Sequence, residues 1–157
     1  MRSESEVIRA VGLYADTVRR VCLCRLRDPR DTEDIFQEVL LRYMRDDTRF
    51  DSAEHEKAWI LRVTLNACSD LKRKIFRRGE IPLEEALQAV QTSDTRREVL
   101  RAVLALKPRY RDAVYLYYYE GYSAKEIAAM LGKRENTVYS LLGRAREQLR
   151  DILGGEA

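Results

Sequence analysis

Six polar and basic residues near the C-terminus have the types and spacing that suit the major groove of duplex DNA. They are Asn136, Thr137, Tyr139, Ser140, Arg144 and Arg146. Hydroxyl and amide groups can pair with base edges, and guanidinium groups can bind phosphate or guanine. The same residues could instead form the solvated face of a helical hairpin, so the elements that carry them matter.

Two helices joined by a tight turn are predicted to present this face. Ser123 can cap the first helix, and Glu126, three residues later, completes a capping box. Gly132 supplies the backbone freedom for a turn, and a second helix begins near Glu135. With the small Ala128 and the apolar positions after the glycine, this spacing is typical of a helix-turn-helix, and it favours DNA binding over a generic basic helix.

Tyrosines are dense just before this unit, in the stretch AVYLYYYEGYS. Stacking on bases is one interpretation of such a cluster. Packing is the preferred one, because Tyr110, Val114, Tyr117 and Tyr118 share one helical face.

A second candidate site lies in AWILRVTLNACSDLKRKIFRR, where an aromatic ring, an amide and a basic end follow one helix. Such a combination could hold single-stranded nucleic acid. The residues are Trp59, Arg62, Asn66, Lys72 and Arg73, with Lys74, Arg77 and Arg78 extending the basic end. Taken alone, Trp59 would more often be a core residue, and a basic run is more often a solvated helix end.

A third group, Asp34, Gln37 and Glu38, lies opposite the apolar stripe of DTEDIFQEVLLRYMR. Acidic groups near a helix N-terminus are also favourable through the helix dipole, so this group alone does not establish a binding site.

The N-terminal elements that position these groups are predicted to be three helices. The first covers residues 5–27 and ends before Pro29, and the second opens at Asp31 with Asp34 in a capping-box-like position. A polar loop follows, and the third helix runs over residues 58–78.

Residues 79–93, which contain Gly79 and Pro82, are predicted to be a linker with room for a short helix. Beyond it, one amphipathic helix starts near Asp94. The next has Pro108 in its first turn and is stopped by Gly121.

Composition limits the class of protein. Hydrophobic residues make up 45% and charged residues 35% of the 157, which indicates a globular chain. Residues 1–93 carry 17 basic and 17 acidic side chains and residues 94–157 carry 12 and 9, so the net charge of +3 comes from the second part. With no apolar run near ~20 residues and no signal peptide, we expect a soluble, cytoplasmic protein without membrane insertion.

Few residues here are suited to catalysis or metal binding. His55 is the only histidine, and neither a Gly-rich phosphate loop nor a nucleophile–base pair is present, so the chain is predicted not to be an enzyme. Cys22, Cys24 and Cys68 form no CxxC pair and are predicted to be buried, reduced thiols. No metal and no cofactor is expected.

Three segments, read in order, are similar to one bacterial family. DIFQE, then AWILRVTLN, then LKPRYRDAVYLYYYEGYSAKEIAAMLGKRENTVYSLLGRAREQLR resemble the extracytoplasmic-function sigma factors of the sigma-70 family, over residues 8–153. The resemblance implies an all-α fold of two small helical domains. Residues 1–78 match the region 2 bundle, residues 94–157 match the region 4 helix-turn-helix domain, and residues 79–93 are the linker between them.

The same resemblance implies a transcription initiation factor that binds core RNA polymerase, directs it to promoters and helps melt the −10 region. Asp34, Gln37 and Glu38 match the helix that docks on the clamp helices of the largest subunit. Asn66 matches the pocket asparagine that captures an unstacked −10 base, and residues 50–57 match the segment that frames the pocket.

Region 4 of the family reads the −35 element and touches the flap of the second-largest subunit, and an anti-sigma factor is an implied partner. This chain departs from many relatives at Tyr139, Leu141, Gly143 and Arg134, which leaves fewer cationic groups for reading bases. The alternative is a helix-turn-helix regulator that binds duplex DNA without polymerase and whose N-terminal module senses a ligand or dimerises.

Overall fold

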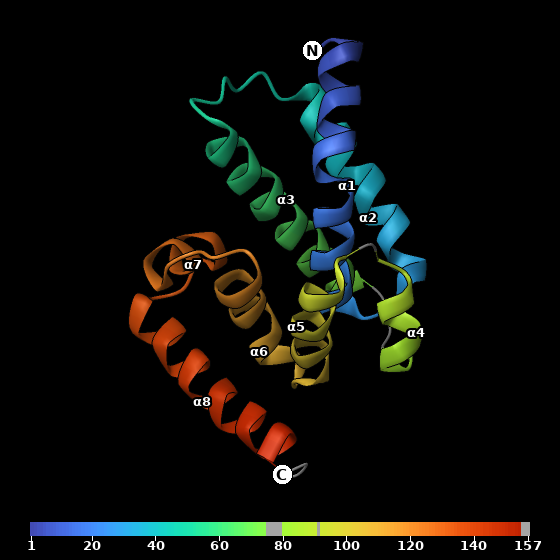
Figure 1. Cartoon of the computed structure of the whole chain (residues 1–157). Helices are drawn as coiled ribbons and strands as arrows, with labels where there is room; N and C mark the ends of the chain where they lie inside the picture. Colours follow the sequence, from blue (N-terminus) through green and yellow to red (C-terminus); the bar gives the residue numbers. More distant parts are fainter. Residues whose placement is uncertain (75–79, 91, 155–157) are drawn as a thin grey trace. The chain divides into compact units, whose positions relative to one another are not determined.

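The computed structural model describes residues 1–74, 80–90 and 92–154 (Figure 1). The chain divides into two compact units, Met1–Pro82 and Leu83–Ala157. Every regular element among the described residues is helical, which confirms the predicted all-α fold class.

Three long helices make the first unit, and each packs against the other two (Figure 1). They are α1 (Glu4–Leu26), α2 (Pro29–Arg45) and α3 (Ala53–Lys74). Each helix buries one apolar stripe, as amphipathic helices in a bundle do. The buried side chains of their shared core include Tyr14, Val18, Cys22, Ile35, Val39, Tyr43, Ile60 and Cys68.

The second helix starts earlier than predicted, because Asp28 caps it and Asp31 does not. The Asp28 carboxylate accepts a hydrogen bond from the backbone N–H of Arg30 at 3.0 Å, and Pro29 occupies the first turn. Proline suits that position because its fixed φ is already helical and its missing N–H would have no partner there. Asp31 lies buried inside the helix. Pro29 therefore begins α2.

The third helix also starts earlier, at Ala53 rather than near residue 58. The Ser52 hydroxyl accepts a hydrogen bond from the backbone N–H of His55 at 3.0 Å, as an N-cap residue does. The loop between α2 and α3 is thereby shortened to residues 46–52. The predicted end of this helix, with Arg77 and Arg78, lies outside the described residues.

The remaining helices make the second unit, which has a core of its own. They are α4 (Leu83–Gln88), α5 (Asp94–Ala105), α6 (Pro108–Val114), the π-helical turn η1 (Tyr115–Tyr119), α7 (Ala124–Leu131) and α8 (Glu135–Gly154). The short α4 falls within the predicted linker and packs on α5. Ala86 and Leu87 are fully buried there, and the Glu84 carboxylate pairs with the Arg101 guanidinium at 3.0 Å.

The π-helical turn interrupts what the sequence predicts as one helix over residues 108–120. Its wider turn changes which side chains face the core. Tyr115 and Tyr119 are buried and stacked with ring centroids 5.0 Å apart. Tyr110 is buried as predicted, but Tyr118 is 45% exposed, so the prediction that it packs on the same face was wrong.

The three cysteines are free and buried, which confirms the prediction for them. The Sγ atoms of Cys22 and Cys68 lie 3.9 Å apart, and this contact together with burial raises the pKa of Cys22. Such a thiol is unreactive at neutral pH. Within residues 1–74, 80–90 and 92–154, no group of three or more His, Cys, Asp or Glu could hold a metal ion. No helix in those ranges is long and apolar enough to cross a membrane.

Candidate nucleic-acid interfaces

The helix-turn-helix predicted for the second unit is present. The Ser123 hydroxyl accepts a hydrogen bond from the Glu126 N–H at 3.1 Å, and the Glu126 carboxylate accepts one from the Ser123 N–H at 3.0 Å. Gly132 adopts the left-handed conformation, with φ 64° and ψ 36°, which a residue with a side chain rarely does. The turn then leads into α8 at Glu135, as predicted.

The six predicted reading residues all lie on α8, and all six are exposed. Tyr139 is 57% exposed, whereas Val138 and Leu142 are buried, so α8 has one apolar and one polar face. Leu141, on the border between the two faces, is half-buried. The arrangement gives a rigid helix an amide, hydroxyls and cations on its free side, and their role in binding stays a prediction.

One of these cations is held in place from the π-helical turn. The Nε of Arg146 donates a hydrogen bond to the Tyr118 hydroxyl at 2.8 Å, and this bond raises the pKa of Arg146. Exposed Tyr118 therefore contributes to the same surface as α8. The sequence prediction missed this, because the wider turn at η1 decides where Tyr118 points.

The second candidate surface is on α3. Arg62, Asn66, Lys72 and Arg73 are exposed there, and the Arg73 guanidinium pairs with the Asp70 carboxylate. The spacing of Arg62, Asn66 and Arg73 keeps these three on one face of a helix.

Trp59 lies at the start of this face and is half-buried. Its ring meets Tyr43 edge to face with centroids 6.0 Å apart, and meets Phe50 in the same way at 5.8 Å. Such pairs favour edge-on geometry because of the ring quadrupole. Trp59 is thus neither a free stacking platform nor a fully buried core residue.

A buried carboxylate lies one turn before Trp59. Glu56 is only 5% exposed, and its oxygens accept hydrogen bonds from Tyr14 (2.7 Å), Tyr43 (2.9 Å) and Arg9 (2.8 Å). Burial by itself would raise the pKa of Glu56, but these donors outweigh it and the pKa is lowered. Burial and the bond to Glu56 raise the pKa of Tyr43. The Glu56 carboxylate is therefore ionised, and its hydrogen bonds join all three helices of the first unit.

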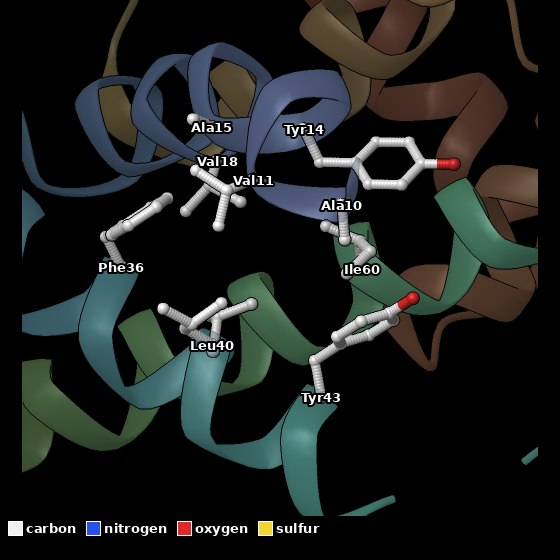
Figure 2. Close-up of a pocket in the computed structure, with 10 residues that line it drawn as sticks. Ala10, Val11, Tyr14, Ala15, Val18, Phe36, Leu40, Tyr43 and Ile60 are labelled. Atoms are coloured by element: carbon white, nitrogen blue, oxygen red, sulfur yellow. The ribbon is translucent and has the colours of Figure 1, made fainter. Parts of the chain in front are cut away.

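Figure 2 shows Tyr14 and Tyr43 among the residues that line an apolar pocket between α1 and α2. Phe36 and Leu40 line the pocket from α2, and Ile60 reaches it from α3. The two hydroxyl oxygens point to the same side of the view, away from the apolar lining.

The sequence prediction assigned Glu56 to a polar loop and so missed it. A signal was available, because Glu56, Ile60 and Val63 follow the spacing of one helical face once the helix is capped at Ser52.

The third candidate group lies on the outside of α2. Asp34 and Gln37 are exposed, and the partly exposed Glu38 pairs with Arg42 at 2.7 Å. Their spacing keeps the three side chains adjacent on the helix surface.

Comparison with known families gives two matches within the chain. The family model for Sigma-70 region 2 matches residues 10–78, and that for Sigma-70, region 4 matches residues 96–149. Together they include the α3 surface, the outer face of α2 and the helix-turn-helix.

Two curated relatives are similar over most of the chain. The ECF RNA polymerase sigma factor SigE of Mycolicibacterium smegmatis is 35% identical over 98% of the chain, which spans 62% of the length of SigE. The ECF RNA polymerase sigma factor SigM of Mycobacterium tuberculosis is 31% identical over 87% of the chain and 71% of its own length.

Among solved structures, the sigma factor RpoE in complex with the anti-sigma factor NepR, from Bartonella quintana, shares the fold. Its TM-score is 0.67 at 20% identity, over 95% of this chain and 97% of that one.

Proposed function

Because the chain belongs to the extracytoplasmic-function sigma factors of the sigma-70 family, we propose that it directs core RNA polymerase to specific promoters. In this role it is a non-enzymatic initiation factor, and it does not act as a regulator independent of polymerase. The observation that carries the proposal is that one chain contains both family regions in order. Each region also presents an exposed polar face, which supports the proposed contacts with DNA.

The first unit is proposed to help melt the −10 element. Opening DNA costs roughly 1.4 kcal/mol of stacking per base-pair step, so the protein must offset it with contacts to exposed bases and phosphates. The α3 surface has groups suited to both. We assign Asn66 to an unstacked base, Trp59 and Arg62 to the edges of that site, and Lys72 and Arg73 to the backbone.

The second unit is proposed to read the −35 element with Asn136, Thr137, Tyr139, Ser140, Arg144 and Arg146. A helix that follows a tight turn is the usual reading element of a helix-turn-helix. We therefore propose that residues 1–78 act on the −10 element and that residues 94–157 bind the −35 element and the polymerase flap. Residues 79–93 connect the two parts.

Protein partners follow from the same family membership. Asp34, Gln37 and Glu38 are proposed to dock on the clamp helices of the largest polymerase subunit. RpoE was solved with an anti-sigma factor, which supports an anti-sigma partner for this chain as well. Both interactions would take place in the cytoplasm.

Co-elution of the purified chain with core RNA polymerase tests the proposal. We expect the wild type to co-elute and a Gln37→Ala/Glu38→Ala double variant to lose most of that binding. Glu4→Ala removes another exposed acid, at the start of α1, and should co-elute like the wild type. No co-elution of the wild type, where a known sigma factor binds, would favour the independent DNA-binding regulator.

Promoter opening tests the assignment of Asn66. With Asn66→Ala, permanganate reactivity of −10 thymines should fall while co-elution with polymerase is retained, because the lost amide serves only the unstacked base. Undiminished thymine reactivity would remove Asn66 from the site.

A further inference from the structure

The loop over residues 46–52 is held by a residue far from it in sequence. The Arg2 side chain donates hydrogen bonds to the backbone oxygens of Tyr43 at 2.9 Å and Thr48 at 2.8 Å. Its guanidinium also lies 4.3 Å from the centroid of the Tyr43 ring and 5.0 Å from that of Phe50. One side chain thereby joins the end of α2 to the loop.

The rings that Arg2 contacts belong to a cluster that reaches α3. Phe50 meets His55 edge to face with centroids 5.2 Å apart and meets Trp59 at 5.8 Å. The backbone N–H of Asp51 donates to Nδ1 of His55 at 3.1 Å, which ties the end of the loop to the first turn of α3. The loop is therefore built onto the face that carries Trp59.

Tyr43 is held from two directions. Its hydroxyl donates to the buried carboxylate of Glu56, and its ring and backbone oxygen face Arg2. The Arg2 side chain is itself only 10% exposed, so this contact is well shielded from water. Arg2 and Glu56 together fix the residue from which the loop departs.

We propose that Arg2 is a positioning residue for base capture, acting through the 46–52 loop and its Phe50–Trp59 pair. This inference rests on the proposed −10 function of the first unit. Fixing the backbone of a residue costs conformational entropy, so a loop ordered in advance lowers the cost of binding an extruded base.

Arginine suits this task better than lysine. Its planar guanidinium stacks on aromatic rings and donates in two directions at once, whereas an ammonium is a compact point charge on a flexible stem. Arg2→Lys should therefore keep the positive charge but lose the contacts by which Arg2 holds the 46–52 loop.

Two measurements on Arg2→Lys and Arg2→Ala test the proposal. In the free protein, amide hydrogen exchange in residues 46–52 should rise while exchange in the core of α1 stays unchanged. With polymerase and a promoter carrying 2-aminopurine at −10, both variants should form open complexes about three- to tenfold less well, as expected when a binding loop loses its preorganisation. Co-elution with polymerase should be retained.

Arg45→Ala is the matched control, since it removes an exposed arginine at the end of α2, just before the same loop. It should alter neither exchange in the loop nor promoter opening. If Arg45→Ala impairs promoter opening as much as Arg2→Ala does, local charge is responsible, and the positioning role of Arg2 is refuted.

The wild type separates the two proposals. A wild-type protein that opens no promoter overturns both the proposed −10 function and the role of Arg2. Normal promoter opening by Arg2→Lys and Arg2→Ala overturns only the role of Arg2. If Arg2→Ala fails to fold, Arg2→Lys alone tests the proposal. Unchanged amide exchange of the 46–52 loop in Arg2→Lys also refutes the positioning role of Arg2.

Discussion

The two units hold their candidate DNA-contacting residues in different ways. In the first unit, Trp59 packs edge to face on Tyr43 and Phe50, and Tyr43 in turn donates to the buried Glu56 carboxylate. In the second, Tyr139 and Arg144 are exposed on α8, a helix that a capping box and a turn glycine set in place. The first surface depends on long-range contacts, and the second depends mainly on local ones.

The difference corresponds to the proposed substrates. Duplex DNA has a regular groove, so a rigid helix with the correct side chains is sufficient to read it. An unstacked base has no such frame, and its binding site must be shaped by the protein before the base arrives. The first unit accordingly has a charged network behind its surface, as a preorganised site requires.

Replacing Glu56 should have the largest effect and tests whether the first unit depends on its network. Hydrogen bonds to charged groups contribute about 1.5–3 kcal/mol each, so Glu56→Gln should lower the free energy of unfolding of this unit by about 2–4 kcal/mol. Denaturant unfolding followed by the fluorescence of Trp59, the single tryptophan of the chain, measures it.

Glu54→Gln serves as the control, because Glu54 is exposed in the first turn of the same helix. An equal loss in both variants would show that the buried network has no special importance. Amide exchange in α7 and α8 should be the same in all three proteins, since these helices belong to the other unit.

The same network predicts a pH dependence. The hydrogen bonds to Glu56 hold its pKa below the ordinary 4.5. Its contribution is therefore fully present above about 4.5 and is lost as the pH falls through the lower, folded-state value. The stability gap between wild type and Glu56→Gln should be constant at neutral pH and shrink in acid, and a gap that instead widens in acid would contradict this.

Removing one reading cation tests the second unit, with a smaller effect. Arg144→Ala should weaken binding to a −35 duplex by ~1–3 kcal/mol if Arg144 contacts a base, and by less if it contacts phosphate. A titration at fixed salt measures this. Arg150→Ala, which removes an exposed arginine later in α8, is the control. Equal affinity of Arg144→Ala and wild type would remove Arg144 from the site.

The smallest effect is expected from the capping box. Ser123→Ala should destabilise the second unit by about 1 kcal/mol, because the Glu126 N–H loses its acceptor. Ser93→Ala is a close control, since Ser93 caps α5 without a side-chain hydrogen bond. Thermal unfolding should separate the two variants. If both lose the same stability, local capping does not hold the reading helix in place.

In the helix-turn-helix, where neighbours in sequence are sufficient, the prediction from sequence was accurate. The Ser123–Glu126 box, the left-handed Gly132 and the start of α8 depend on residues within one or two turns. The exposed face of α8 follows from the 3.6-residue period for the same reason. The sequence by itself therefore determined the all-helical fold and the exposed face of α8.

Only the tertiary structure decided how the first unit's surface is built. Glu56 on α3 accepts hydrogen bonds from Tyr14 and Arg9 on α1, and Arg2 contacts a loop more than 40 positions away in the sequence. Likewise, the π-helical turn that exposes Tyr118 adds one residue to a helix whose period the sequence suggested was regular. A buried carboxylate is stable only where several donors converge on it, and that convergence depends on how the helices pack.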